Sequence, residues 1–102
     1  MIVETIYNRL KERDRKLSKS SFCKIYLNKS RNYWFVLNHT NTEISDNALI
    51  NLYGNLKGMA NTWRNIGNDD SLEGNAIYKD CERFSQELAD MVMNEIERRA
   101  LS

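Results

Sequence analysis

Two side chains that can read DNA bases lie next to each other at Arg31 and Asn32. Arginine can form paired hydrogen bonds with guanine in the major groove, and asparagine can do the same with adenine. Ser30 precedes them and can cap the first amides of a helix, which predicts a helix over about residues 30–38. Phe35 lies on this helix and can contact a thymine methyl group. We therefore predict base contacts by Arg31, Asn32 and Phe35.

Cationic and polar side chains surround this predicted helix, as phosphate contacts require. Lysine neutralises phosphate charge, while hydroxyl and amide groups donate hydrogen bonds to phosphate oxygens. Such contacts supply affinity and orientation but no base specificity. The residues predicted to contact phosphate are Lys19, Ser21, Lys24, Lys29, Tyr33 and Asn38.

The remaining reactive side chains form no catalytic or metal-binding pattern. The single histidine, His39, has no Cys or Ser at motif spacing. Cys23 and Cys81 are far apart and lack partners at ligand spacing, so they predict neither a disulfide framework nor a zinc site. This cysteine usage favours a reduced, cytoplasmic setting, and no apolar run is long enough to span a membrane. We expect no enzyme activity, no cofactor and no metal.

The elements that must position these side chains are all predicted to be helices. Proline is absent, and apolar residues recur at intervals of three and four. A first helix is expected over about residues 2–14, and a second, for which Ser18 with Ser21 offers a cap before Phe22, is expected to end near Leu27. We also expect Leu17 to return to the core.

Two further helices are predicted after a loop at residues 39–42. Ser45 should cap a helix that continues to about residue 65, although Gly54 and Gly58 favour a kink or an end near Gly58. A last helix should begin at Ser71 and continue to the end of the chain, which gives it a length of about 45 Å. The fold class is therefore all-α, a small helical bundle with a long C-terminal helix.

The stretch of residues 20–37 has the spacing of a helix-turn-helix, two short helices joined by a tight turn. The turn contains Asn28 and Lys29, and Trp34 and Leu37 fall on the inner face of the second helix. In such motifs the second helix enters the major groove of DNA. Cys23 stands where two helices approach closely, and we expect it to pack in the core.

This pattern resembles the lambda-repressor-like, or Cro/repressor-type, helix-turn-helix family over about residues 2–58. The residues that carry the resemblance are Phe22, Cys23, Tyr26, Leu27, Asn28, Ser30, Tyr33, Trp34 and Leu37. It implies a DNA-binding transcriptional regulator of phage or bacterial type. Asn28 stands where the family commonly has glycine, and asparagine also tolerates left-handed backbone. Ser20 or Ser21 replaces a frequent glutamine, and Phe35 and Val36 replace polar residues.

The apolar stripe of the last helix predicts a second interface. It should cover a head formed by residues 1–66, or it should pair with the same helix of a second chain, so that residues 67–102 make a homodimer. Two copies of the motif would then read half-sites about 34 Å apart. The residues predicted to form the dimer are Phe84, Leu88, Met91 and Val92.

Charge is distributed unevenly along the single predicted domain. Residues 1–40 contain nine Lys and Arg against three Asp and Glu, whereas residues 41–102 contain six against eleven. A basic front half favours double-stranded DNA as the partner. The alternative is a protein-interaction module that inhibits a host protein through the aromatic helix at residues 30–38 or through the acidic side chains of the last helix, Asp80, Glu82, Glu87, Asp90, Glu95 and Glu97.

Overall fold

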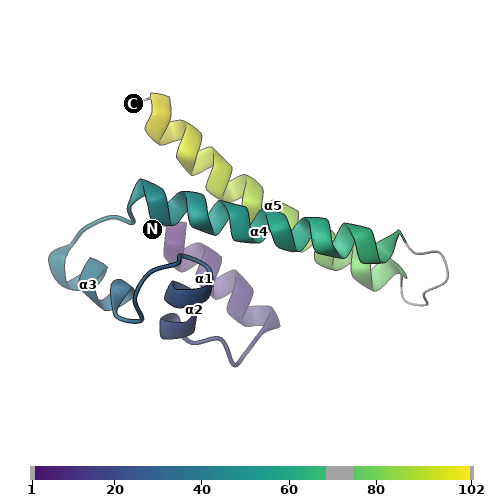
Figure 1. The fold of residues 1–102 in the computed structure, drawn as a ribbon, viewed down its shortest axis with the longest axis horizontal. Coiled ribbons are helices and arrows are strands. Elements are labelled where there is room, and N and C mark those ends of the chain that lie inside the picture. The colour runs from purple at the N-terminus through teal and green to yellow at the C-terminus, as the bar shows by residue number, and fades with distance from the viewer. Residues whose placement is uncertain (1, 69–74, 102) are drawn as a thin grey trace. The chain divides into compact units, whose positions relative to one another are not determined.

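The structure is a computed structural model that describes residues 2–68 and 75–101. Within these ranges the secondary structure is entirely helical, with no strand, and the predicted all-α fold class is confirmed. The helices are α1 (Ile2–Arg13), α2 (Lys19–Ile25), α3 (Tyr33–Thr40), α4 (Asp46–Gly67) and α5 (Asn75–Leu101) (Figure 1). Across the described residues, no helix is both long enough and apolar enough to cross a bilayer.

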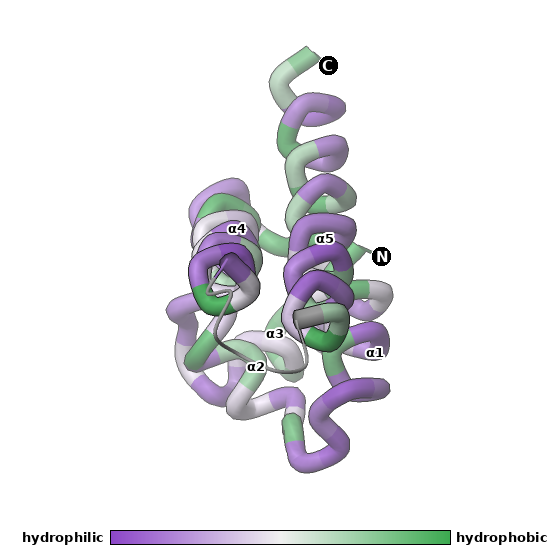
Figure 2. The backbone as a smooth tube through the Cα atoms, turned by 90° about the vertical axis from the view of Figure 1, so that its right-hand side faces the viewer, coloured by the Kyte–Doolittle hydropathy of each residue, from purple (hydrophilic) through white to green (hydrophobic). Residues whose placement is uncertain are grey.

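The chain divides into two compact units, and the division falls within α4. Unit 1 is Met1–Leu52 and contains α1, α2, α3 and the start of α4; unit 2 is Tyr53–Ser102 and contains the rest of α4 with α5. In unit 2 the end of α4 and the first part of α5 run antiparallel, side by side (Figures 1 and 2). Trp63 stacks on Tyr78 with ring centroids 5.9 Å apart, which joins the end of α4 to the start of α5.

Unit 1 is built around a cluster of aromatic rings from three helices. Tyr7 of α1 stacks on Phe22 of α2 with centroids 5.5 Å apart, and Trp34 of α3 meets these rings edge-on at 5.1 and 5.9 Å. Edge-on and offset pairs of this kind stabilise a fold by about 0.5–1.5 kcal/mol beyond the burial of their surface. Trp34 and Leu37 are buried, as predicted for the inner face of α3.

Two further core predictions in unit 1 are confirmed. Leu17 is buried, and its carbonyl oxygen accepts a hydrogen bond of 3.1 Å from the Tyr7 hydroxyl. Cys23 is fully buried in α2, and this burial raises the pKa of its thiol, against a smaller opposing effect of a backbone hydrogen bond at Trp34. The thiol therefore stays protonated and packs as a small apolar group.

The ends of α2 follow from two local signals. The Ser18 side chain accepts a hydrogen bond of 3.1 Å from the Ser21 N–H, which confirms the predicted cap. Asn28 has left-handed backbone with φ of 55°, a conformation that asparagine tolerates. Beside it the Lys29 N–H donates to the Cys23 carbonyl at 3.0 Å, and this bond turns the chain away from α2.

The predicted start of α3 at Ser30 is wrong, because the helix begins at Tyr33. Ser30 does not cap it; the Ser30 carbonyl instead accepts the Tyr33 N–H at 3.1 Å in a turn. The chain reverses its direction at Asn28, and the residues that follow lead it to the start of α3 without being helical. The connection between α2 and α3 is therefore seven residues long, 26–32. A helix-turn-helix has a turn of about three or four residues, so the predicted tight turn is also wrong.

The end of α3 and the start of α4 are both capped. At the end of α3, Asn41 is left-handed, and the Asn41 and Thr42 N–H groups donate to the Asn38 and Leu37 carbonyls. This is the arrangement of a Schellman motif. The Ser45 hydroxyl accepts the Ala48 N–H at 3.2 Å, which confirms the predicted cap of α4.

Beyond these caps, α4 is one uninterrupted helix rather than one that stops near Gly58. The predicted start of the last helix at Ser71 lies outside the described residues.

Candidate nucleic-acid interface

One long segment of unit 1 contains basic side chains and no acidic ones. Between Asp14 and Glu43, residues 15–42 include six Lys or Arg and no Asp or Glu; we call this the acid-free segment. It comprises the loop after α1, all of α2, the connection 26–32 and α3. Its cations are Arg15, Lys16, Lys19, Lys24, Lys29 and Arg31.

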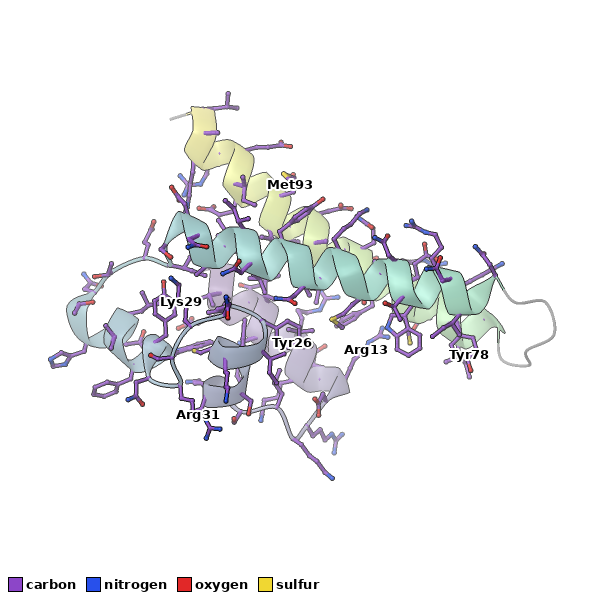
Figure 3. All side chains as sticks on the ribbon, viewed as in Figure 1. Arg13, Tyr26, Lys29, Arg31, Tyr78 and Met93 are labelled. Carbon is purple, nitrogen blue, oxygen red and sulfur yellow. The ribbon has the colours of Figure 1, made fainter. Side chains whose placement is uncertain are left out.

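None of these six cations forms an ion pair with a carboxylate of the residues that the structure describes. All are exposed except Lys29, which is half-buried. Lys19 lies over the Trp34 ring with its Nζ 4.9 Å from the centroid, and Lys29 lies over the Tyr33 ring at 5.8 Å. Figure 3 shows Lys29 and Arg31 on the connection between α2 and α3, with Arg31 extending outward. The segment therefore offers uncompensated positive charge.

The cations of unit 2 contrast with those of the acid-free segment. Arg64 pairs with Glu82 at 2.8 Å between Nε and Oε2. Arg98 and Arg99 both pair with Glu95 at 2.6 and 2.9 Å, and their hydrogen bonds lower the pKa of Glu95 to about 2. Three cations of unit 2 are thus neutralised by carboxylates within the chain, whereas the six cations of the acid-free segment are available to a polyanion.

A lysine of α1 orders the loop that carries two of the six cations. The Lys11 Nζ donates to the Leu17 carbonyl at 2.8 Å and to the Arg15 carbonyl at 3.3 Å. These bonds fix the backbone on either side of Lys16. Sequence reasoning did not find this role, because a lysine in the last turn of a helix is expected to bond the last carbonyl groups of that helix, whereas Arg15 and Leu17 lie beyond the end of α1.

The outward side of α3 is apolar in part. Helical periodicity places four residues on the side of α3 opposite the buried Trp34 and Leu37. We call these four residues the outer face of α3: Asn32, Phe35, Val36 and His39. Phe35 is 70% exposed and Val36 is 48% exposed. The His39 ring lies parallel to the Phe35 ring, with centroids 5.8 Å apart and 8° between the planes.

The structure places the predicted base-reading residues together at the surface. Arg31 and Asn32 are exposed, but they lie in the turn before α3 rather than in its first turn. The Asn32 carbonyl accepts the Val36 N–H at 2.9 Å, so Asn32 is nevertheless aligned with the helix that follows. Phe35 lies three residues after Asn32, on the same side of α3.

The predicted phosphate contacts are less uniform. Lys19, Ser21, Lys24 and Asn38 are exposed, whereas Lys29 and Tyr33 are half-buried. The Tyr33 hydroxyl accepts the Ser45 N–H at 3.0 Å and donates to the Ser45 hydroxyl at 3.3 Å. Tyr33 therefore joins α3 to the start of α4. The residues next to Tyr33 in the sequence did not indicate this structural role.

The predicted dimer residues lie along α5. Phe84, Leu88 and Val92 are buried and Met91 is half-buried. A homodimer through these residues stays a prediction that the mass in solution tests.

Most of the acidic side chains on α5 interact within the chain. Glu82 and Glu95 are ion-paired, and Asp90 accepts a hydrogen bond of 2.8 Å from Gln86. Asp80 and Glu87 also have partners in the chain.

Comparisons with known proteins place the chain in a family without assigning it a role. Within the described ranges no group of three or more His, Cys, Asp or Glu could hold a metal ion. No curated protein and no solved structure matches the chain. None of the comparisons indicates the lambda-repressor-like family. The chain belongs to DUF6626, a family of unknown function whose model matches residues 3–101.

Proposed function

We propose that unit 1 binds double-stranded DNA. In this proposal α3 and the connection before it face the major groove, and the surrounding cations contact phosphates. The observation that carries the proposal is the acid-free segment, whose six cations have no carboxylate partner among the described residues. A duplex supplies the missing negative charge at a high density. We propose a regulatory role for this binding, as the resemblance to repressor-type helix-turn-helix proteins implied.

The number of available cations sets the expected salt dependence. Each phosphate that a cation neutralises contributes about 0.9 to the slope of log affinity against log salt concentration. Contacts by all six would give a slope of about −5. Contacts by three or four of them would give a slope of about −3.

A pair of charge variants tests the proposal. Lys16→Ala/Lys24→Ala removes two exposed cations of the acid-free segment whose ammonium groups have no partner among the described residues. Lys79→Ala/Arg83→Ala removes two exposed cations of α5 and is the matched control. Surface substitutions of this kind change stability by less than about 0.5 kcal/mol, so both variants should fold.

The measurement is the fluorescence anisotropy of a labelled duplex at several salt concentrations. We expect the first variant to flatten the slope by about 2 and the control to leave it unchanged. Absence of duplex binding by the wild type at about 50 mM salt, where electrostatic affinity is high, contradicts the proposal. Equal slopes for the two variants contradict it as well.

The second candidate function is binding of another protein through α3. It is favoured by the exposure of Phe35 and Val36, since large apolar side chains at the surface often mark protein interfaces. Affinity from apolar burial depends little on salt, in contrast to phosphate contacts. Absence of binding between the wild-type chain and duplex DNA at low salt would favour protein binding as the function.

A further inference from the structure

We infer that the outer face of α3 recognises A·T base pairs in the major groove, with Phe35 and Val36 contacting thymine 5-methyl groups and Asn32 contacting adenine. This inference rests on the proposed function. It goes further by naming the bases that the interface prefers.

The chemistry of the outer face matches one kind of base pair. In the major groove an A·T pair presents the adenine N7 acceptor and N6 donor beside the thymine methyl group. Asparagine can bond both adenine groups, and apolar side chains contact the methyl group. Asn32 precedes Phe35 by three residues and Val36 by four, so the amide and the apolar groups occupy the same side of α3. A G·C pair offers no methyl group to Phe35 or Val36.

The Phe35 ring is held in an exposed position. His39 lies against it at 5.8 Å with nearly parallel planes, so the two rings support each other although 70% of Phe35 is exposed to solvent. Val36 is stiff because its side chain branches at Cβ. Both side chains can therefore bury a methyl group without a large loss of side-chain freedom.

Charge favours DNA over a protein as the occupant of this face. α3 lies within the acid-free segment, so a partner that docks on Asn32 and Phe35 also approaches Arg31, which directly precedes Asn32. A duplex presents methyl groups in the floor of a groove that is edged by phosphates. This combination matches an apolar face within a cationic segment.

The methyl group alone can be removed or added in the test. The probes are duplexes of equal length with alternating dA and dT, with dU in place of dT, with alternating dG and dC, and with 5-methyl-dC in place of dC. Uracil lacks only the methyl group of thymine, and 5-methylcytosine adds that group at the same edge. Burial of one methyl group strengthens binding by about four-fold.

We expect the wild type to bind the dT duplex at least about four-fold more tightly than the dU duplex. It should also bind the 5-methyl-dC duplex more tightly than the dC duplex. Phe35→Ala/Val36→Ala should bind both members of each pair equally and should keep the wild-type salt slope. Both positions are exposed, so this variant should fold. Asn32→Ala should weaken binding to the dA-containing duplexes and keep the preference for methylated probes.

Equal wild-type affinity for methylated and unmethylated probes overturns the inference. If the affinity for these duplexes still falls steeply with salt concentration, the proposed function, binding of double-stranded DNA, is retained. Failure to bind any of the four duplexes at low salt overturns both.

Discussion

Replacing two glycines of α4 by alanine should stabilise the protein. Gly54 and Gly58 are exposed in the interior of a continuous helix of 22 residues. A Cβ atom built on either residue meets nothing within 4 Å. The substitutions therefore add helix propensity without a steric cost.

The size of the effect follows from helix propensity. Glycine is about 0.8–1.0 kcal/mol less favourable than alanine in a helix interior, mainly because its unfolded backbone is more flexible. Gly54→Ala/Gly58→Ala should raise the free energy of unfolding by about 2 kcal/mol, and each single variant by about half of that. With a denaturant dependence of about 2 kcal/mol per molar urea, the midpoint moves up by roughly 1 M.

The assay is urea unfolding followed by far-ultraviolet circular dichroism. Arg83→Gly is the reverse control on α5, where it should lower the free energy of unfolding by about 0.8 kcal/mol. An unchanged or lower midpoint for the double alanine variant would refute the reasoning. It would mean that α4 is not a regular helix at these glycines or that another group approaches them closely.

Two further predictions concern a turn and an ion pair. Asn28→Ala should lower the free energy of unfolding by about 1 kcal/mol, because asparagine tolerates left-handed backbone and alanine does not, whereas Asn28→Gly should not lower it because glycine has no Cβ atom; equal urea midpoints for the two variants argue against this explanation. The pKa of Glu95 is lowered from 4.5 to about 2 by Arg98 and Arg99, so the stabilisation is present above about pH 4.5 and is lost as the pH falls through 2. Glu95→Gln should cost less than about 1 kcal/mol at neutral pH, because ion pairs between residues three or four positions apart on a helix are weak. The wild-type and variant stabilities, measured by urea unfolding, should converge near pH 2, and a constant difference across this range contradicts the assignment.

Local sequence signals predicted those parts of the fold that local chemistry determines. Ser18 and Ser45 cap their helices with their own hydroxyl groups, and the spacing of Trp34 and Leu37 determined which side of α3 is buried. These features depend on residues within one turn of each other. For that reason they could be recognised without coordinates.

The start of α3 could not be predicted in the same way. Ser30 is a residue type that caps helices well, but the chain reverses its direction at Asn28. Ser30 is part of the turn that follows this reversal, so it does not cap α3. Contacts distant in sequence then determine where the helix begins: Tyr33 bonds Ser45, and Trp34 packs on Phe22. A pattern of nearby residues contains no information about these contacts.

The candidate interface shows the same division between local and distant information. Sequence reasoning found the basic residues and singled out Phe35, since both depend on residue type. It could not show that the six cations lack carboxylate partners among the described residues, because a partner can come from any part of the chain. It also could not show that His39 supports the Phe35 ring.

The two tryptophans give each unit its own intrinsic fluorophore. Trp34 lies in the aromatic cluster of unit 1 beneath the Lys19 ammonium group, and Trp63 stacks on Tyr78 in unit 2. The chain has no other tryptophan. Chains that keep one indole and carry phenylalanine at the other position therefore report the melting of one unit at a time, so the emission spectrum can reveal whether the halves of α4 unwind together.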